Sequence, residues 1–120
     1  MKKKVGAHPH GKYEEMPPIS RAAATKALKS KNKSGIIRTL LRLALTDPEW
    51  RWVQERCLPF LGHQDPWVRG AAATSLGHLA RIHHCLELDQ VKPRLQRLAD
   101  DPEMGDKARD ALDDIRNFIR

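Results

Sequence analysis

The sequence predicts an all-α protein built of short helical hairpins, and three of its features lead to that fold class. Apolar residues recur at steps of three or four in six segments, which is the spacing of the buried side of an amphipathic helix. No segment alternates apolar and polar residues over a useful length, so strands are not expected. The dipeptide Asp-Pro, a common helix start, occurs at 47–48, 65–66 and 101–102.

The N-terminal part is expected to contain a tail and the first hairpin. Residues 1–17 are rich in Lys, His, Gly and Pro, so we expect a flexible basic tail followed by one domain over residues 18–120. Residues 19–31 predict a weakly amphipathic helix. A second helix is predicted to begin with Ser34 as its N-cap, and its apolar stripe comprises Ile36, Ile37, Leu40, Leu41, Leu43 and Ala44.

The middle of the chain predicts a second hairpin. Asp47-Pro48 is expected to start its first helix, because Asp accepts a hydrogen bond from an unpaired backbone N–H and Pro lacks one. The apolar side of this helix comprises Trp50, Val53, Cys57, Leu58 and Leu61, and Gly62 is its expected end. Asp65-Pro66 is expected to start the second helix in the same way. The buried side of that helix comprises Val68, Ala72, Leu76, Leu79 and either Ile82 or His83.

The C-terminal part predicts a third hairpin. Asp89 is expected to cap its first helix, which buries Val91, Leu95 and Leu98. Asp101-Pro102 is expected to open its second helix, whose inward residues are Met104, Ala108, Ala111, Leu112, Ile115, Phe118 and Ile119. The chain of 120 residues is long enough to bury one core between six such helices.

Two segments repeat the same order of features. Residues 58–66 and residues 91–102 each contain part of an apolar helix with a proline and end with Asp-Pro. A second predicted helix follows each of these segments. The two Asp-Pro pairs lie 36 residues apart. A period of this length is typical of solenoids made of helical hairpins, in which each hairpin packs against its neighbours.

The segment from 59 to 80 resembles a HEAT repeat. The residues that carry the resemblance are Pro59, Asp65-Pro66-Trp67-Val68-Arg69, Ala71-Ala72-Ala73, Leu76-Gly77 and Leu79-Ala80. The resemblance implies a short α-solenoid of about three antiparallel HEAT-like helical hairpins. Gly70 and Gly77 lie seven residues apart on one side of the helix, where small residues let the next hairpin approach closely. Asp65 and Arg69 lie four residues apart, and we expect them to pair.

Charge and cysteine content restrict the class of protein. Residues 1–46 contain eleven Lys and Arg against two Glu, a balance of +9, whereas residues 47–120 have a balance of −2. No apolar run approaches the ~20 residues that span a bilayer, and the basic start is not followed by the apolar stretch of a secretory signal. Cys57 and Cys85 are expected to be buried structural thiols. Two reduced cysteines favour the cytoplasm, so we expect a cytoplasmic protein without a membrane partner.

Candidate catalytic and metal-binding residues form no motif that we recognise. His83 and His84 are adjacent and point to different faces of a helix, and His78 lies five residues from His83 rather than four. Both cysteines lie within apolar patterns, and the sequence has neither a phosphate-binding loop nor a dinucleotide-binding fingerprint. We therefore expect no catalytic residues, no metal and no cofactor, which means that the protein is not expected to be an enzyme.

The second helices of the last two hairpins carry the candidate partner-binding residues. Those of the last helix are a stripe of Asp106, Asp110, Asp113 and Asn117, with Glu103 and Asp114 beside it. Those of the preceding hairpin are Trp67, Thr74, His78 and Arg81. In a HEAT stack the second helices line the concave face, so the resemblance places an acidic stripe beside an exposed tryptophan. This arrangement suits a protein partner with a basic site, and the alternative is a solvated face with Trp67 buried against the preceding loop.

The expected function is that of a non-enzymatic protein-binding module. The chain is similar in style to small bacterial immunity proteins of polymorphic-toxin and contact-dependent growth inhibition (CDI) systems. That resemblance implies a cytoplasmic protein that binds and neutralises a cognate toxin domain, and a basic site on the partner favours a nuclease. Two alternatives stay open: a general adaptor or scaffold, and a nucleic-acid-binding HEAT-like protein. The latter would use the basic N-terminal third, with Lys26, Lys29, Lys31, Lys33, Arg38 and Arg42.

Overall fold

The computed structural model describes residues 16–120, and within them every regular element is helical. The elements are α2 (Arg21–Lys29), α3 (Lys33–Thr46), α4 (Trp50–Cys57), the 3-10 helix η1 (Leu58–Gly62), α5 (Pro66–His83), α6 (Leu88–Leu98) and α7 (Gly105–Phe118). The predicted all-α fold is therefore confirmed. The expected flexible tail over 1–17 lies almost wholly outside the described residues.

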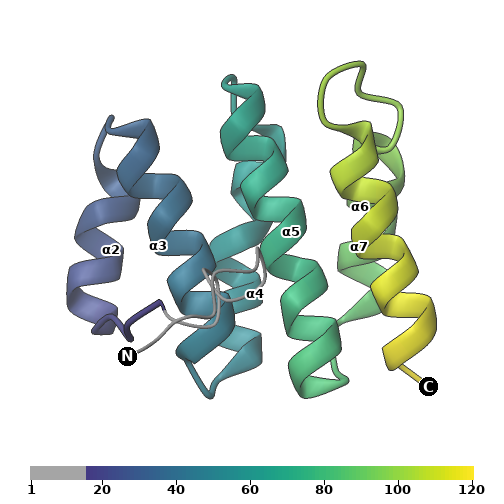
Figure 1. Ribbon diagram of the computed structural model, residues 1–120, viewed down its shortest axis with the longest axis horizontal. Helices are drawn as coiled ribbons and strands as arrows, with labels where there is room; N and C mark the ends of the chain where they lie inside the picture. Colours follow the sequence, from purple (N-terminus) through teal and green to yellow (C-terminus); the bar gives the residue numbers. More distant parts are fainter. Residues whose placement is uncertain (1–15) are drawn as a thin grey trace, which may run out of the picture.

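The helices form three successive hairpins. The first is α2 with α3, the second is α4 and η1 with α5, and the third is α6 with α7. The most extensive contacts between hairpins join α3 to α5 and α5 to α7. The second helix of each hairpin therefore packs against the second helix of the next hairpin (Figure 1). In Figure 1, α3, α5 and α7 stand side by side, while α4 and α6 lie behind them. No helix of the described part is long and apolar enough to cross a membrane.

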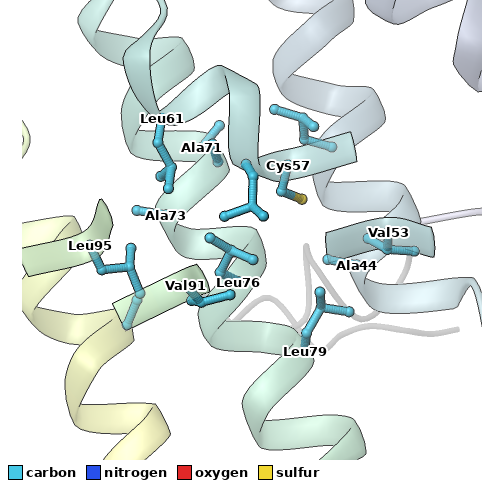
Figure 2. Close-up of a cluster of buried hydrophobic side chains, with 14 of the residues drawn as sticks. Ala44, Val53, Cys57, Leu61, Ala71, Ala73, Leu76, Leu79, Val91 and Leu95 are labelled. Carbon is cyan, nitrogen blue, oxygen red and sulfur yellow. The ribbon is translucent and has the colours of Figure 1, made fainter. Parts of the chain in front are cut away.

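The core lies between these two layers. Figure 2 shows its centre, where Val53, Cys57 and Leu61 of the second hairpin meet Leu76 and Leu79 of α5, with further core residues at Ala44, Ala71, Ala73, Val91 and Leu95. Most apolar residues predicted to face inward are buried, but some are not. Ile82 is 40% exposed, and Leu112, Phe118 and Ile119 are only half-buried at the C-terminal end of the stack, where no further hairpin covers them.

The small residues of α5 face α7, as predicted. A methyl group added at Gly70 would lie 2.7 Å from the sulfur of Met104, and one added at Gly77 would lie 3.3 Å from the Cα of Ala111. Side chains at these two positions would hold the third hairpin away from the second. The alanines and glycines of α5 therefore let α5 and α7 pack at close range.

The helix caps agree only in part with those predicted from the sequence. Asp65 caps α5 as predicted, because its Oδ1 accepts from the backbone N–H groups of Trp67 and Val68. The cap of α3 is Asn32 and not Ser34, since the Asn32 side chain accepts from the N–H of Gly35. The cap of α6 is Glu87 and not Asp89, which lies in the first turn.

Asp47 and Asp101 each accept hydrogen bonds from backbone N–H groups in a turn, which precedes α4 and α7 respectively. The Oδ1 of Asp47 accepts from the N–H of Glu49, and α4 begins only at Trp50. The Oδ1 of Asp101 accepts from the N–H groups of Glu103 and Met104, and α7 begins only at Gly105. The predicted starts of α4 and α7 were therefore too early, because the aspartate accepts within an Asx-type turn first.

The expected Asp65–Arg69 pair is absent from the described residues, and both side chains bind neighbouring hairpins instead. Lys33 of α3 pairs with Asp65 at 2.9 Å, and Arg69 pairs with Asp101 at 3.0 Å. Arg69 also donates to the carbonyl oxygens of His63 and Gln64. Each pair joins the start of one second helix to the next hairpin, so these charges hold the stack in register.

A buried glutamine forms a further link between hairpins. The Nε2 of Gln54 donates to Oε1 of Glu87 at 2.7 Å, and the N–H of Glu87 donates to Oε1 of Gln54 at 2.7 Å. Gln54 is fully buried on α4, so this pair of hydrogen bonds satisfies its amide and fixes the entry into α6.

Candidate partner-binding groove

The face formed by α3, α5 and α7 contains a groove of about 550 Å³. Its lining residues are Ile37, Leu41, Trp67, Gly70, Ala71, Thr74, His78, Met104, Lys107, Asp110, Ala111 and Asp114, and this set is called the α5–α7 groove below. Small residues contribute to this lining on both helices, namely Gly70 and Ala71 on α5 and Ala111 on α7.

The groove brings together five of the ten predicted partner-binding residues. Trp67, Thr74 and His78 line it from α5, and Asp110 and Asp114 line it from α7. Trp67 is 66% exposed, which contradicts the alternative in which it was buried against the preceding loop. Apolar and charged side chains of two different hairpins therefore share one concave surface.

The other five predicted residues lie outside the lining of the groove, which contains Lys107, Asp110, Ala111 and Asp114 from α7. The predicted stripe of Asp106, Asp110, Asp113 and Asn117 is exposed along its whole length, but of these four residues only Asp110 lines the groove. The five residues are Arg81, Glu103, Asp106, Asp113 and Asn117. Arg81 hydrogen-bonds His78 at 2.8 Å, Glu103 lies 3.8 Å from Arg69, and Asp113 pairs with Arg116 on the surface.

Several lining residues were not predicted to be part of a site. Ile37 and Leu41 were assigned to the core of the first hairpin, yet both also border the groove. Lys107 adds one positive charge to the lining, and both Lys107 and Met104 lie against Gly70. The apolar stripe of α3 is broad, and that breadth was the only signal in the sequence that part of it lies beyond the core.

The environment of the groove alters two pKa values. Burial, assisted by the charge of Arg81, lowers the pKa of His78 to about 4, so this imidazole is neutral near pH 7. Burial raises the pKa of Asp114, and the nearby carboxylates of Asp110 and Asp113 raise it further, while Arg81 acts in the opposite direction. Asp114 therefore lies in a partly desolvated place, where Arg81 offsets part of the effect of burial.

The other candidate reactive groups are held in structural roles. Cys57 is fully buried, and burial raises the pKa of its thiol to about 12. The thiolate, which is the form that acts as a nucleophile, is therefore suppressed.

Cys85 is exposed in the loop after α5, which corrects the prediction that it is buried. That loop begins where His84 adopts a left-handed backbone with φ of 58° and its Nδ1 lies 2.8 Å from the carbonyl oxygen of Phe118. Within residues 16–120, no three His, Cys, Asp or Glu side chains gather in a way that could hold a metal ion.

The basic N-terminal third is partly engaged within the fold. Lys33 pairs with Asp65, and Arg42 donates to the carbonyl oxygens of Pro17 and Pro18 at 2.9 and 2.7 Å. Two of the six residues proposed for phosphate binding therefore have intramolecular partners. The groove described above lies on the other side of α3 from α2, on the face that continues into the acidic last helix.

A second hollow of about 490 Å³ lies between η1 and α6. Its walls combine apolar residues of η1 with Arg94, Arg97 and Asp100 of the third hairpin, and Arg69 lies there already bound to Asp101. The two exposed arginines make this hollow basic, in contrast to the α5–α7 groove.

The comparisons with known proteins give one informative likeness. No family model and no curated protein matches the sequence, so membership of the HEAT-repeat proteins stays a prediction. A chain in the crystal structure of a CDI complex from Cupriavidus taiwanensis LMG 19424 is similar to this chain, with a TM-score of 0.79 and 31% sequence identity. The match covers 87% of this chain and 94% of that chain, so it extends over all three hairpins.

Proposed function

Because the chain belongs to the same family as that component of a CDI complex, we propose that it is a CDI immunity protein, which binds a toxin domain and neutralises it without catalysis. The similarity over 94% of that chain is the observation that carries the proposal. The immunity protein is proposed to act in the cytoplasm, where it would meet the toxin domain. A nuclease is the proposed class of toxin.

The structure favours the immunity role over the toxin role within such a complex. A stack of helical hairpins presents an extended surface for another macromolecule. The groups with catalytic potential serve the fold instead, since Cys57 is buried with a raised pKa and His78 is bound to Arg81. By contrast, the α5–α7 groove is open and has an exposed tryptophan at its edge.

The proposed binding surface is the face of α3, α5 and α7. Trp67 supplies an aromatic anchor that is already exposed, and aromatic residues dominate the energetics of many protein interfaces. Asp110 and Asp114 supply carboxylates that would occupy a basic cleft where a nucleic-acid phosphate would otherwise bind. Complementary charge would also accelerate association and make its rate sensitive to salt.

Titration of the purified chain with the toxin domain of the same CDI system tests this function. We expect a 1:1 complex with a dissociation constant of about 1 nM or below, corresponding to about 12 kcal/mol of binding free energy. Trp67→Ala should weaken the complex at least tenfold, while Trp67→Phe should retain part of the affinity. Absence of binding by the wild-type chain, together with retention of an added nucleic acid, would favour the nucleic-acid alternative instead.

A further inference from the structure

The α5–α7 groove is long and differs in character at its two ends. Gly70 faces Met104 and Lys107, whereas Gly77 faces Ala111 and Asp114, so α5 and α7 run in the same direction along the groove. Trp67 lies at the Met104 end and His78 at the Asp114 end. At the rise of an α-helix these two α5 residues are about 16 Å apart, which suits an extended or helical segment of a partner rather than one small molecule.

Two carboxylates line the groove toward its Asp114 end, and the charge of Arg81, which is not a lining residue, lowers the pKa of Asp114 in part. Asp110 and Asp114 are separated by one helical turn, which places their side chains about 6 Å apart. Within residues 16–120 neither carboxylate forms an ion pair, although Asp47, Asp65, Asp101 and Asp113 all do. Lys107 is the only cationic residue among those that line the groove, so its lining has a net charge of −1 with His78 neutral.

The surroundings of these carboxylates favour a guanidinium over an ammonium group. Ile37, Leu41 and Ala111 are apolar members of the groove lining. A guanidinium is more weakly hydrated than an ammonium, so it enters a partly apolar groove more readily. Its planar fork can also donate to two carboxylates at once. Burial raises the pKa of Asp114, and a cation placed against this carboxylate would favour its charged form.

The exposed tryptophan at the other end is consistent with a partner that covers the groove. Arginine side chains lie over the rings of Trp50 and Trp52, at 4.8 and 4.9 Å from the ring centroids. In the described part of the chain, Trp67 has no such cover and remains 66% exposed. The Trp67 end of the groove is therefore open to a partner.

Building on the proposed immunity function, we propose that a segment of the toxin domain lies along the α5–α7 groove and inserts an arginine side chain between Asp110 and Asp114. Trp67 packs against the same segment about 16 Å away. The immunity protein thereby recognises one particular arginine of its toxin rather than basic charge in general. This arginine would determine which toxin domains the chain can neutralise.

A double-mutant cycle tests the proposal. Each arginine of the toxin domain is changed in turn to glutamine, and its dissociation constant is measured with the wild-type chain and with Asp114→Asn. One arginine should be found whose replacement weakens binding by about 10- to 100-fold. The same replacement should have almost no further effect against Asp114→Asn or Asp110→Asn, since the partner carboxylate is already lost.

The control is Asp113→Asn, which removes a carboxylate that pairs with Arg116 outside the groove. Asp113→Asn should leave the dissociation constant unchanged within about twofold. Because the pKa of Asp114 is raised, Asp114→Asn should fold at least as well as the wild type, and the free energy of unfolding checks this.

The outcomes separate this inference from the proposed function. If the wild-type chain does not bind the toxin domain, the immunity function fails. If the wild type binds but Asp110→Asn and Asp114→Asn bind equally well, the immunity function stands and the groove inference fails. Coupling of Asp114 to a lysine of the toxin domain, with no coupled arginine, would also contradict it.

Discussion

At the scale of single residues, close approach of backbones decides where side chains can be tolerated. Gly105 begins α7 next to the carbonyl oxygen of Ala99, and a methyl group added at Gly105 would lie 2.5 Å from that oxygen. The oxygen belongs to the backbone and also accepts from Arg109 at 2.7 Å, so it cannot move away without loss of that bond. At Gly62, no atom lies within 4 Å of the added methyl group.

These two glycines give a matched pair of variants. Gly105→Ala should lower the free energy of unfolding by about 1–3 kcal/mol, because the methyl group forces the start of α7 away from α6. Gly62→Ala should be neutral or stabilise by about 0.4–1 kcal/mol through the unfolded chain. Urea denaturation measures both, and equal stabilities of the two variants would show that α7 can shift freely at its start.

The sequence identified Gly70 and Gly77 as positions of close approach between helices, but it did not identify Gly105. A run of alanine and glycine within a helix is a visible pattern, and it predicted correctly that α5 meets the next hairpin closely. The constraint on Gly105 comes from a carbonyl at the end of α6, which no local pattern reveals. The same limit explains Cys85, whose burial was predicted wrongly because the left-handed turn at His84 was not anticipated.

At the scale of helices, charged side chains between hairpins set the register of the stack. Arg69 connects α5 to the turn between α6 and α7 through Asp101 and holds the loop before α5 through two carbonyl oxygens. Its side chain and that of Asp101 are 17% and 16% exposed, so water screens this pair only in part. Arg116 and Asp113 are 72% and 56% exposed on one helix.

Truncation of these two arginines should therefore have different effects. Arg69→Ala should destabilise the protein by about 2–4 kcal/mol, because it leaves a half-buried carboxylate and two carbonyl oxygens without their donor. Arg116→Ala should change stability by no more than about 0.5 kcal/mol. Thermal unfolding monitored by circular dichroism distinguishes them, and a neutral Arg69→Ala would mean that apolar packing alone aligns the hairpins.

The positions of the helices were largely predictable from the sequence, whereas their first residues and the side chains that they present to the groove were not. Periodic apolar residues and Asp-Pro pairs located the six α-helices found within residues 16–120, since both signals are local. The starts of α4 and α7 were misplaced because Asp47 and Asp101 first close a turn. The outward stripe of α7 is exposed as predicted, but periodicity alone does not determine that Asp114 at its edge, rather than Asp113, lines the groove.

At the scale of the whole molecule, the three hairpins place unlike charges in different parts of one stack. Residues 16–46 contain seven Lys and Arg and no Asp or Glu, whereas the groove on the face of α3, α5 and α7 contains two carboxylates and one lysine. The likeness to a chain of a CDI complex extends over the stack, with 31% identity and a TM-score of 0.79. The sequence could indicate a binding module of this shape, but the groove depends on contacts between hairpins.

Growth of bacteria that produce the toxin domain of the same CDI system tests the central claim most directly. Co-production of the wild-type chain should restore growth, because the toxin domain is bound before it acts. The double variant Trp67→Ala/Asp114→Asn should be produced in folded form and should protect poorly, since it lacks both the anchor and the carboxylate of the groove. Growth arrest in the presence of the folded wild-type chain would contradict the account.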